Sequence, residues 1–337
     1  NAGDNTVIAG AGADQIKIAG GANTVVGDEG TATFYADGQI RLIRSTHTNT
    51  GGNDTINSNA TGNNVVLGGF GSDTIQLGSG QNFVFGDHGV VHFGSNGEID
   101  SIQSIDDANG AADSIDLADG RNVIVGGAGA DKMTAGSGVN TVLGDDGEAS
   151  FFADGQIRLI QSTNSNVGGD DEITLEDGTN TVIAGAGSDI LTLGGGTNYV
   201  LADEGMLEAL TDASGDKTGT TQVKSLNGSV GGEDTVAIGS GYNVVIGGAN
   251  SDTITVSGTD ADAQATVLGD NGQMTFSNDG VLLSVESTDY ASGAADKITL
   301  TDGTNAVIGG AGADKMTAGS GVNTVLGDDG EASFFAD

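Results

Sequence analysis

Apolar and polar residues alternate along this chain on a nine-residue beat. Asp113, Asn122, Asp131 and Asn140 stand nine residues apart, with Asp and Asn in turn, and the same beat recurs in other parts of the sequence. An apolar side chain follows two residues after each of these positions, usually Ile, Leu or Met after Asp and usually Val after Asn. Consecutive units therefore place their apolar side chains in two different environments.

Each nine-residue unit predicts a turn followed by a short strand. Glycine is frequent in the turn part, where it permits positive φ, and β-branched residues that suit a pleated sheet fill the strand part. If successive strands fall on opposite sheets, residues 18 apart in the sequence stack about 4.8 Å apart along the axis. We therefore predict an all-β fold, a parallel β-roll (β-solenoid), with Asp stacked on Asp along one edge and Asn on Asn along the other.

A segment of another type interrupts the nine-residue units about every 60 residues. In residues 148–163 alternating apolar residues flank an Asp-Gly pair, which is a strong signal for a β-hairpin. We expect strands near residues 149–152 and 156–160. This hairpin arm either widens a sheet and covers the flank of the roll, or forms a docking surface for a neighbouring unit or chain, because an exposed hairpin edge can pair with another strand.

The repeats indicate one continuous solenoid rather than separate domains. Residues 126–154 return letter for letter at 309–337, and the sequence starts and stops inside the repeating pattern, so we interpret the chain as a fragment of a longer one. We place the repeat units at residues 1–50, 51–109, 110–167, 168–230, 231–292 and 293–337.

The composition adds a charge problem to this fold. The chain has 47 acidic and 10 basic residues and a net charge of -37, a self-repulsion that cations must neutralise and that argues against nucleic acid as a partner. The 61 glycines raise the entropic cost of folding further. The chain has no cysteine, so neither disulfides nor thiolate metal ligands can hold it together, and oxygen ligands are plentiful. We expect bound cations to be part of the folded structure.

The nine-residue unit resembles a known calcium-binding repeat. GGAGADKMT at residues 126–134 and again at 309–317 matches the consensus GGxGxDxUx (U apolar) of the RTX or haemolysin-type repeats, and GGFGSDTIQ at 68–76 is a close variant. The resemblance implies a parallel β-roll with Ca²⁺ held between stacked turns, type I-like export from a Gram-negative cell, and folding triggered by external calcium. Because Asn replaces Asp on alternate rungs, we expect metal chiefly along the Asp edge.

The stacked Asp residues are the main candidate ligands for Ca²⁺, which takes about six to eight oxygens from carboxylates and backbone carbonyls. Carboxylates stacked about 5 Å apart repel one another without a cation, which favours calcium over the alternative that these residues only cap turns. The candidate ligands on this edge are Asp14, Asp54, Asp73, Asp113, Asp131, Asp171, Asp189, Asp234, Asp252, Asp296 and Asp314.

A second set of acidic residues closes each unit, in segments such as GDDG at 144–147. Each falls on the next turn of the Asp edge, where its carboxylate either shares a further ion or belongs to a plain turn. We include these residues among the candidate ligands: Asp28, Asp87, Asp145, Asp203, Asp270 and Asp328. On the Asn edge, neutral amides can stack in hydrogen-bonded ladders at no charge cost, so we expect ladders there rather than metal.

The sequence predicts a structural protein rather than an enzyme. His47, His88 and His92 do not recur between units, and the acidic pairs are periodic instead of forming one distinct pair in a cleft. No apolar stretch is long enough to span a membrane.

We expect a calcium-stabilised extracellular stalk or fibre, as an adhesin shaft, a biofilm matrix filament or a surface-layer element. Calcium is the expected partner, and copies of the chain are candidate partners through their arms. The alternatives are an ice- or carbohydrate-binding adhesin module, which a lattice of Thr and Asn would favour, and a calcium-dependent secretion tail of a larger exported protein.

Overall fold

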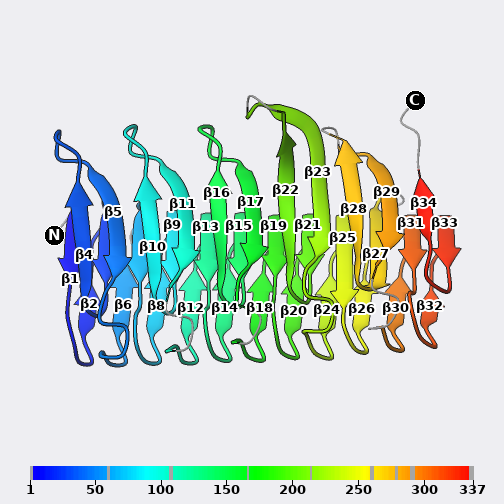
Figure 1. Cartoon of the computed structure of the whole chain (residues 1–337), viewed down its shortest axis with the longest axis horizontal. Helices are drawn as coiled ribbons and strands as arrows, with labels where there is room; N and C mark the ends of the chain where they lie inside the picture. The colour runs from blue at the N-terminus through cyan, green and yellow to red at the C-terminus, as the bar shows by residue number, and fades with distance from the viewer. Residues whose placement is uncertain are drawn as a thin grey trace.

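Three long sheets run side by side along the axis of the molecule (Figure 1). The computed structural model describes residues 3–58, 61–105, 109–164, 167–212, 215–258, 262–277, 280–288 and 293–333. These residues form strands and turns and no helix, so no helix among them could cross a membrane. Two of the sheets are parallel and contain the nine-residue units; the third is antiparallel and contains the interrupting segments.

The first parallel sheet, here the Asn sheet, contains the strands that carry the Asn rungs. Its strands pair in register, so that Asn122 lies opposite Asn140, 18 residues away, as the sequence predicted. Its twelve strands are β1 (Asn5–Ile8), β3 (Asn23–Val26), β7 (Asn64–Leu67), β9 (Gly80–Phe85), β13 (Gly120–Val125), β15 (Gly138–Leu143), β19 (Gly178–Ile183), β21 (Gly196–Leu201), β25 (Gly241–Gly248), β27 (Gln264–Asp270), β31 (Gly303–Ile308) and β33 (Gly321–Leu326).

The second parallel sheet, here the Asp sheet, contains the strands that follow the Asp rungs. Ile115 lies opposite Met133, again 18 residues away. Its eleven strands are β2 (Gln15–Lys17), β6 (Thr55–Ser58), β8 (Thr74–Leu77), β12 (Ser114–Leu117), β14 (Lys132–Ala135), β18 (Glu172–Leu175), β20 (Ile190–Leu193), β24 (Thr235–Ile238), β26 (Thr253–Val256), β30 (Lys297–Leu300) and β32 (Lys315–Thr317). The chain therefore alternates between the two sheets and forms a parallel β-roll.

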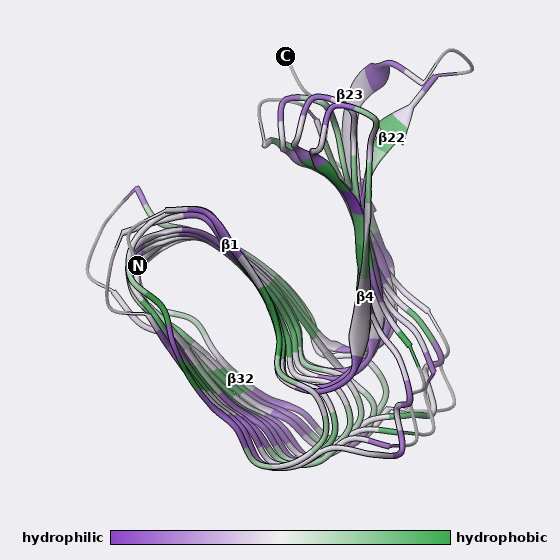
Figure 2. Ribbon diagram, turned by 90° about the vertical axis from the view of Figure 1, so that its left-hand side faces the viewer, coloured by the Kyte–Doolittle hydropathy of each residue, from purple (hydrophilic) through white to green (hydrophobic). Residues whose placement is uncertain are grey.

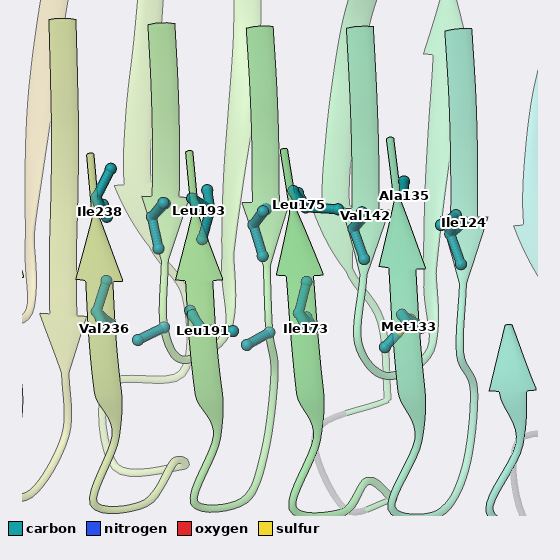
Figure 3. Close-up of a cluster of buried hydrophobic side chains, with 14 of the residues drawn as sticks. Ile124, Met133, Ala135, Val142, Ile173, Leu175, Leu191, Leu193, Val236 and Ile238 are labelled. Carbon is teal, nitrogen blue, oxygen red and sulfur yellow. The ribbon is translucent and has the colours of Figure 1, made fainter. Parts of the chain in front are cut away.

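The apolar residues of the nine-residue beat fill the space between the two parallel sheets. Ile124 and Val142 of the Asn sheet and Met133, Ile173 and Leu191 of the Asp sheet belong to one buried cluster (Figure 3). Removing an aliphatic side chain of this size from water stabilises the fold by about 1.5–3 kcal/mol. Because each coil contributes the same few side chains, this core grows in proportion to the number of coils.

The interrupting segments form the third sheet, here the arm sheet. β16 and β17 pair antiparallel, close to the positions expected for the hairpin strands, and β17 also pairs with β22 of the next arm, so the arms join edge to edge. Its strands are β4 (Gly30–Phe34), β5 (Ile40–Ser45), β10 (Gly89–Phe93), β11 (Ile99–Ser104), β16 (Gly147–Phe151), β17 (Ile157–Ser162), β22 (Gly205–Thr211), β23 (Lys217–Ser225), β28 (Gly272–Ser277), β29 (Leu282–Ser287) and β34 (Glu331–Ser333).

The Asn sheet lies between the other two sheets, and both of its faces are covered. Seen along the axis, β32 of the Asp sheet and β4 of the arm sheet lie on either side of β1 (Figure 2). Within one strand, Val142 belongs to the cluster shared with the Asp sheet, while Leu143 belongs to a second buried cluster with Ala149 and Ile160 of the arm. This double burial explains why the strand part of the Asn units is apolar at consecutive positions.

A ladder of buried amides runs along the Asn edge. Nδ2 of Asn122 donates to Oδ1 of Asn140 at 2.9 Å and to the carbonyl of Ala118 at 3.0 Å. Asn140 repeats this pattern with Oδ1 of Asn180 at 2.9 Å and the carbonyl of Gly136 at 2.9 Å. Each of these amides thus supplies both a donor and an acceptor to the ladder, so their buried polar atoms are hydrogen-bonded without any charge.

We predict that Asn140→Ala lowers the free energy of unfolding by about 1–3 kcal/mol, because it leaves a buried acceptor on Asn180 unpaired and takes one partner from Asn122. Urea unfolding in excess calcium, followed by circular dichroism, measures this cost. Asn323→Ala is the matched control, because Asn323 is an exposed member of the same ladder and its loss should cost clearly less. Equal costs for the two variants would contradict the prediction.

Candidate metal centre

The Asp residues of the edge form a second ladder, which uses the backbone as its donor. The N–H of Asp113 donates to Oδ1 of Asp131 at 2.7 Å, and the N–H of Asp131 donates to Oδ1 of Asp171 at 2.7 Å. The same bond links every consecutive pair from Asp14 to Asp314. The preceding coil therefore holds each carboxylate in place through one of its two oxygens.

The other oxygen of each carboxylate is buried and accepts no hydrogen bond. This holds for ten consecutive members of the ladder, whereas nearly all buried polar atoms in native proteins have a partner. Leaving a buried carboxylate oxygen unpaired is costly, and repeating it on every coil multiplies the cost. The atoms are Oδ2 of Asp54, Asp73, Asp113, Asp131, Asp171, Asp189, Asp234, Asp252, Asp296 and Asp314.

Backbone carbonyl oxygens lie beside these unpaired oxygens. A Cβ added to Gly126 would collide both with Oδ2 of Asp131 and with the carbonyl oxygen of Gly144 on the next coil. The same holds for Gly86, whose Cβ would meet Oδ2 of Asp113 and the carbonyl oxygen of Gly126. The turns therefore bring carboxylate and carbonyl oxygens together against glycines, and these are the two donor types that Ca²⁺ takes from proteins.

Burial strongly disfavours the ionised form of these carboxyl groups. Desolvation raises the pKa of Asp73 to about 8 and that of Asp131 to about 7. Desolvation, followed by repulsion from Asp131, raises the pKa of Asp171 to about 10. The edge at neutral pH therefore needs either protons or a cation to balance its charge.

The donor set of the edge fits calcium better than a transition metal. Among the described residues, no three His, Cys, Asp or Glu side chains are grouped as a metal cluster. An ion at this edge would therefore take its ligands from pairs of stacked carboxylates and from backbone carbonyls, an all-oxygen set suited to a hard cation. Predicted pairs such as Asp113 with Asp131 are neighbours in the ladder. The assignment of individual ligands stays a prediction.

The second set of acidic residues has different surroundings. Oδ1 of Asp145 accepts the N–H of Gly169 at 3.1 Å, and its Oδ2 accepts the N–H of Ala186 at 2.5 Å. Asp28, Asp87 and Asp203 are likewise held by two backbone amides, Asp270 accepts from Ala294, and Asp328 is exposed. Metal binding by this second set stays a prediction. In the structure these carboxylates accept hydrogen bonds from backbone N–H groups. The sequence predicted both sets as candidate ligands, because the amides that meet the second set come from residues 24 and 41 positions away from an Asp such as Asp145.

The chain matches the model of a known family. The family model of the RTX calcium-binding nonapeptide repeat (4 copies) matches residues 1–34, 58–89, 107–148, 167–205 and 299–331, which together make up more than half of the chain. The matched segments contain most of the Asp and Asn rungs described above, and they leave out the larger part of the arms. A search of curated proteins finds no match.

We predict opposite effects of Asp131→Asn with and without calcium. The variant keeps the Oδ1 acceptor for Asp113 and removes one buried charge, so it should stabilise the calcium-free chain and weaken calcium binding at the edge by about tenfold. Calorimetric calcium titration measures the binding, and far-UV circular dichroism in calcium-stripped buffer measures the residual β-structure of the calcium-free chain. Asp116→Asn, on the exposed face of the Asp sheet, is the control and should change neither. An unchanged calcium affinity in Asp131→Asn would rule out this carboxylate as a ligand.

We also predict that the calcium-free chain is more stable at about pH 5.5 than at about pH 8. The folded-state pKa values of Asp73 and Asp131, about 8 and about 7, lie above the ordinary value of 3.8. The folded chain then binds more protons than the unfolded chain, so this contribution to stability falls as the pH rises from about 4 through the folded values. Far-UV circular dichroism in calcium-stripped buffer across this range tests the sign: the content of β-structure should be higher at about pH 5.5, and a higher content at about pH 8 would refute the prediction.

Proposed function

Because the chain belongs to the RTX calcium-binding nonapeptide repeat family, we propose that it forms a stiff extracellular stalk or fibre that calcium stabilises along its whole length. RTX repeats are typical of secreted proteins of Gram-negative bacteria. An adhesin shaft, a biofilm matrix filament and a surface-layer element are the roles that suit such a rod. Its work is mechanical, and we propose no catalytic step for this segment.

The observation that carries this proposal is the unbroken row of unpaired carboxylate oxygens. It extends from Asp54 to Asp314, through ten successive coils, instead of being confined to one site. A ligand that binds only the folded chain adds about 2.7 kcal/mol per site at a hundredfold excess over its dissociation constant. Ions repeated along the edge would therefore stabilise the whole roll, which is what a load-bearing rod needs.

The continuity of the sheets supports stiffness. Each of the three sheets runs through the described residues as a single set of neighbouring strands. Neighbouring coils are tied by the Asp ladder, by the roll core and by the arm sheet, and also by the Asn ladder except at Ala265, which stands in the place of an Asn. Bending the rod would have to break several of these contacts at once, because proteins pack at crystal-like density and deform little.

Calcium would also tie folding to location. With a net charge of -37 and buried carboxylates, the calcium-free chain pays a large electrostatic cost for compactness. Where free calcium is low, as inside a cell, the chain would stay extended and ready for export. Outside, calcium would balance the edge and the roll would form.

We predict a cooperative change from coil to β-structure when calcium is added to the stripped chain, and no such change with magnesium, which demands a tighter octahedral site. Far-UV circular dichroism during the two titrations measures this. A chain that is fully folded in chelator would overturn the calcium part of the proposal. Small-angle X-ray scattering in calcium tests the other part, because a rod and a flexible chain differ in the cross-section region of the curve.

A further inference from the structure

The turns that carry an arm differ from the other turns at one position. In an uninterrupted turn, such as residues 126–131, the second residue is glycine, here Gly127 with φ 109°. In the turn that carries the third arm, the chain passes through Gly144, places Asp145 at this second position and resumes the turn at Gly169. Asp therefore replaces glycine at the point where the chain leaves the roll.

The carboxylate of this Asp spans the base of the arm. In the uninterrupted turn one residue separates Gly127 from Gly129, whereas Asp145 and Gly169 are 24 positions apart in the sequence. Oδ1 of Asp145 accepts the N–H of Gly169 at 3.1 Å, so a hydrogen bond joins the points at which the chain leaves and re-enters the roll. Oδ2 accepts the N–H of Ala186 on the next coil at 2.5 Å.

The same contact recurs at the other described arms. In each case one oxygen accepts the amide at the return of the arm. At Asp28, Asp87 and Asp203 the other oxygen accepts an amide of the next coil, whereas Oδ2 of Asp270 is buried without a hydrogen-bond partner. The pairs are Asp28 with Gly52 at 3.2 Å and Phe70 at 2.6 Å, Asp87 with Ala111 at 3.2 Å and Ala128 at 2.7 Å, Asp203 with Gly232 at 3.2 Å and with Ala249, and Asp270 with Ala294 at 3.1 Å.

The roll keeps its register whatever the length of the arm. The contact from Asp to the returning amide spans 24 positions at four arms and 29 positions at Asp203, whose arm is longer. Across this longer arm, Asn198 still donates to Asn243 at 2.8 Å, 45 positions away, and across the third arm Asn140 donates to Asn180 at 2.9 Å, 40 positions away. The extra residues are absorbed in the arm and do not reach the roll.

Glycines on both sides leave room for the carboxylate. A Cβ at Gly168, on the returning chain, would collide with the carboxylate of Asp145. Gly185, on the next coil, has φ 117°, and a Cβ there would collide with the same carboxylate. A side chain on either flank would displace the Asp, so the pocket around it is built for a carboxylate that meets two amides.

We propose that Asp28, Asp87, Asp145, Asp203 and Asp270 are clips that close the bases of the arms. Each clip turns its coil into an insertion point, at which the roll accepts a segment of variable length without losing its register. This role concerns the arms and is independent of the stalk or fibre function. It assigns these carboxylates to backbone amides, whereas the unpaired oxygens of the Asp edge are the ones left to bind a cation.

Hydrogen exchange combined with calcium counting tests the clip in the whole chain. Asp145→Asn keeps the side-chain volume and the Oδ1 acceptor for Gly169, but its amide nitrogen cannot accept from Ala186. In saturating calcium we expect the Ala186 amide to exchange about tenfold faster, a loss of about 1.4 kcal/mol of protection, with the number of bound ions unchanged. Asp131→Asn is the matched control and should change calcium binding while leaving the Ala186 amide protected.

Two results would overturn the proposal. One is a loss of bound calcium in Asp145→Asn without faster exchange at Ala186, which would make Asp145 a ligand. The other is wild-type behaviour in both measurements, which would make the contact incidental.

An insertion experiment tests the second part of the proposal without altering the clip. Six Gly and Ser residues inserted between Thr163 and Asn164, inside the segment that Asp145 closes, should leave the calcium concentration at half-folding within about twofold, because loop entropy grows slowly with length. The same six residues between Gly129 and Ala130 lie in a turn that has no clip of its own and beyond the Ala128 amide that Asp87 contacts, and they should raise that concentration severalfold or prevent folding. Equal effects at the two positions would show that arm-bearing turns are not special insertion points.

Discussion

The stacking of carboxylates in a dry edge is the constraint on which the rest of this structure depends. The backbone places Oδ2 of Asp113 and Asp131 out of water and beside other oxygens, and no basic side chain is among the described partners of this edge. The two ion pairs of the described residues, Lys132 with Glu172 and Lys217 with Asp154, involve exposed or partly exposed side chains. The compensating charge therefore has to come from outside the chain, as protons or cations. The stability of the fold then depends on the pH and on the cations of the surrounding solution.

The two edges differ in one side-chain atom, because Asn carries the donor Nδ2 where Asp carries the acceptor Oδ2. Asn122 donates through its side chain to Oδ1 of Asn140 and Asn140 donates to Asn180, so that an amide inside the ladder is both donor and acceptor. Asp113 donates through its backbone to Oδ1 of Asp131, and the second oxygen is left over. Stacked Asn side chains therefore need no counter-charge, while the Asp edge needs protons or a cation to balance its charge. A chain with Asp on every rung would carry this cost on both edges.

The periodic part of the fold could be predicted from the sequence because every nine-residue unit repeats the same spacing of polar, apolar and glycine residues. The beat from Asp113 to Asn140 fixes which residues stack, and the apolar residue two positions later fixes which face is buried. The joining of the arms could not be predicted in this way. It depends on β17 meeting β22, and nothing in the pattern of one hairpin says which strand will lie beside it.

The contacts of the second acidic set could not be predicted from the sequence for a similar reason. The carboxylate of Asp145 accepts hydrogen bonds from two backbone amides, 24 and 41 positions away in the sequence. These amides come close to it only because the arm returns to the roll. A signal was present in the sequence, because a Gly-Asp or Ala-Asp pair opens each arm and glycine stands where the arm returns. Without coordinates this pattern is equally typical of an ordinary turn, since Asp and Gly are common in turns of every kind.

The contacts between coils explain why such a roll can be extended without limit. Asn122 meets Asn140 within a unit and Asn140 meets Asn180 across an arm, both at 2.9 Å, so the junction between units is the same as the junction inside one. In a solenoid of this kind, stability is a sum of nearest-neighbour terms. Each added coil also adds a buried carboxylate, and an ion several coils away offsets its charge less than an ion beside it, because the attraction between two charges falls with distance. The charge compensation must then be periodic as well, and an edge that repeats one carboxylate on every coil has that form.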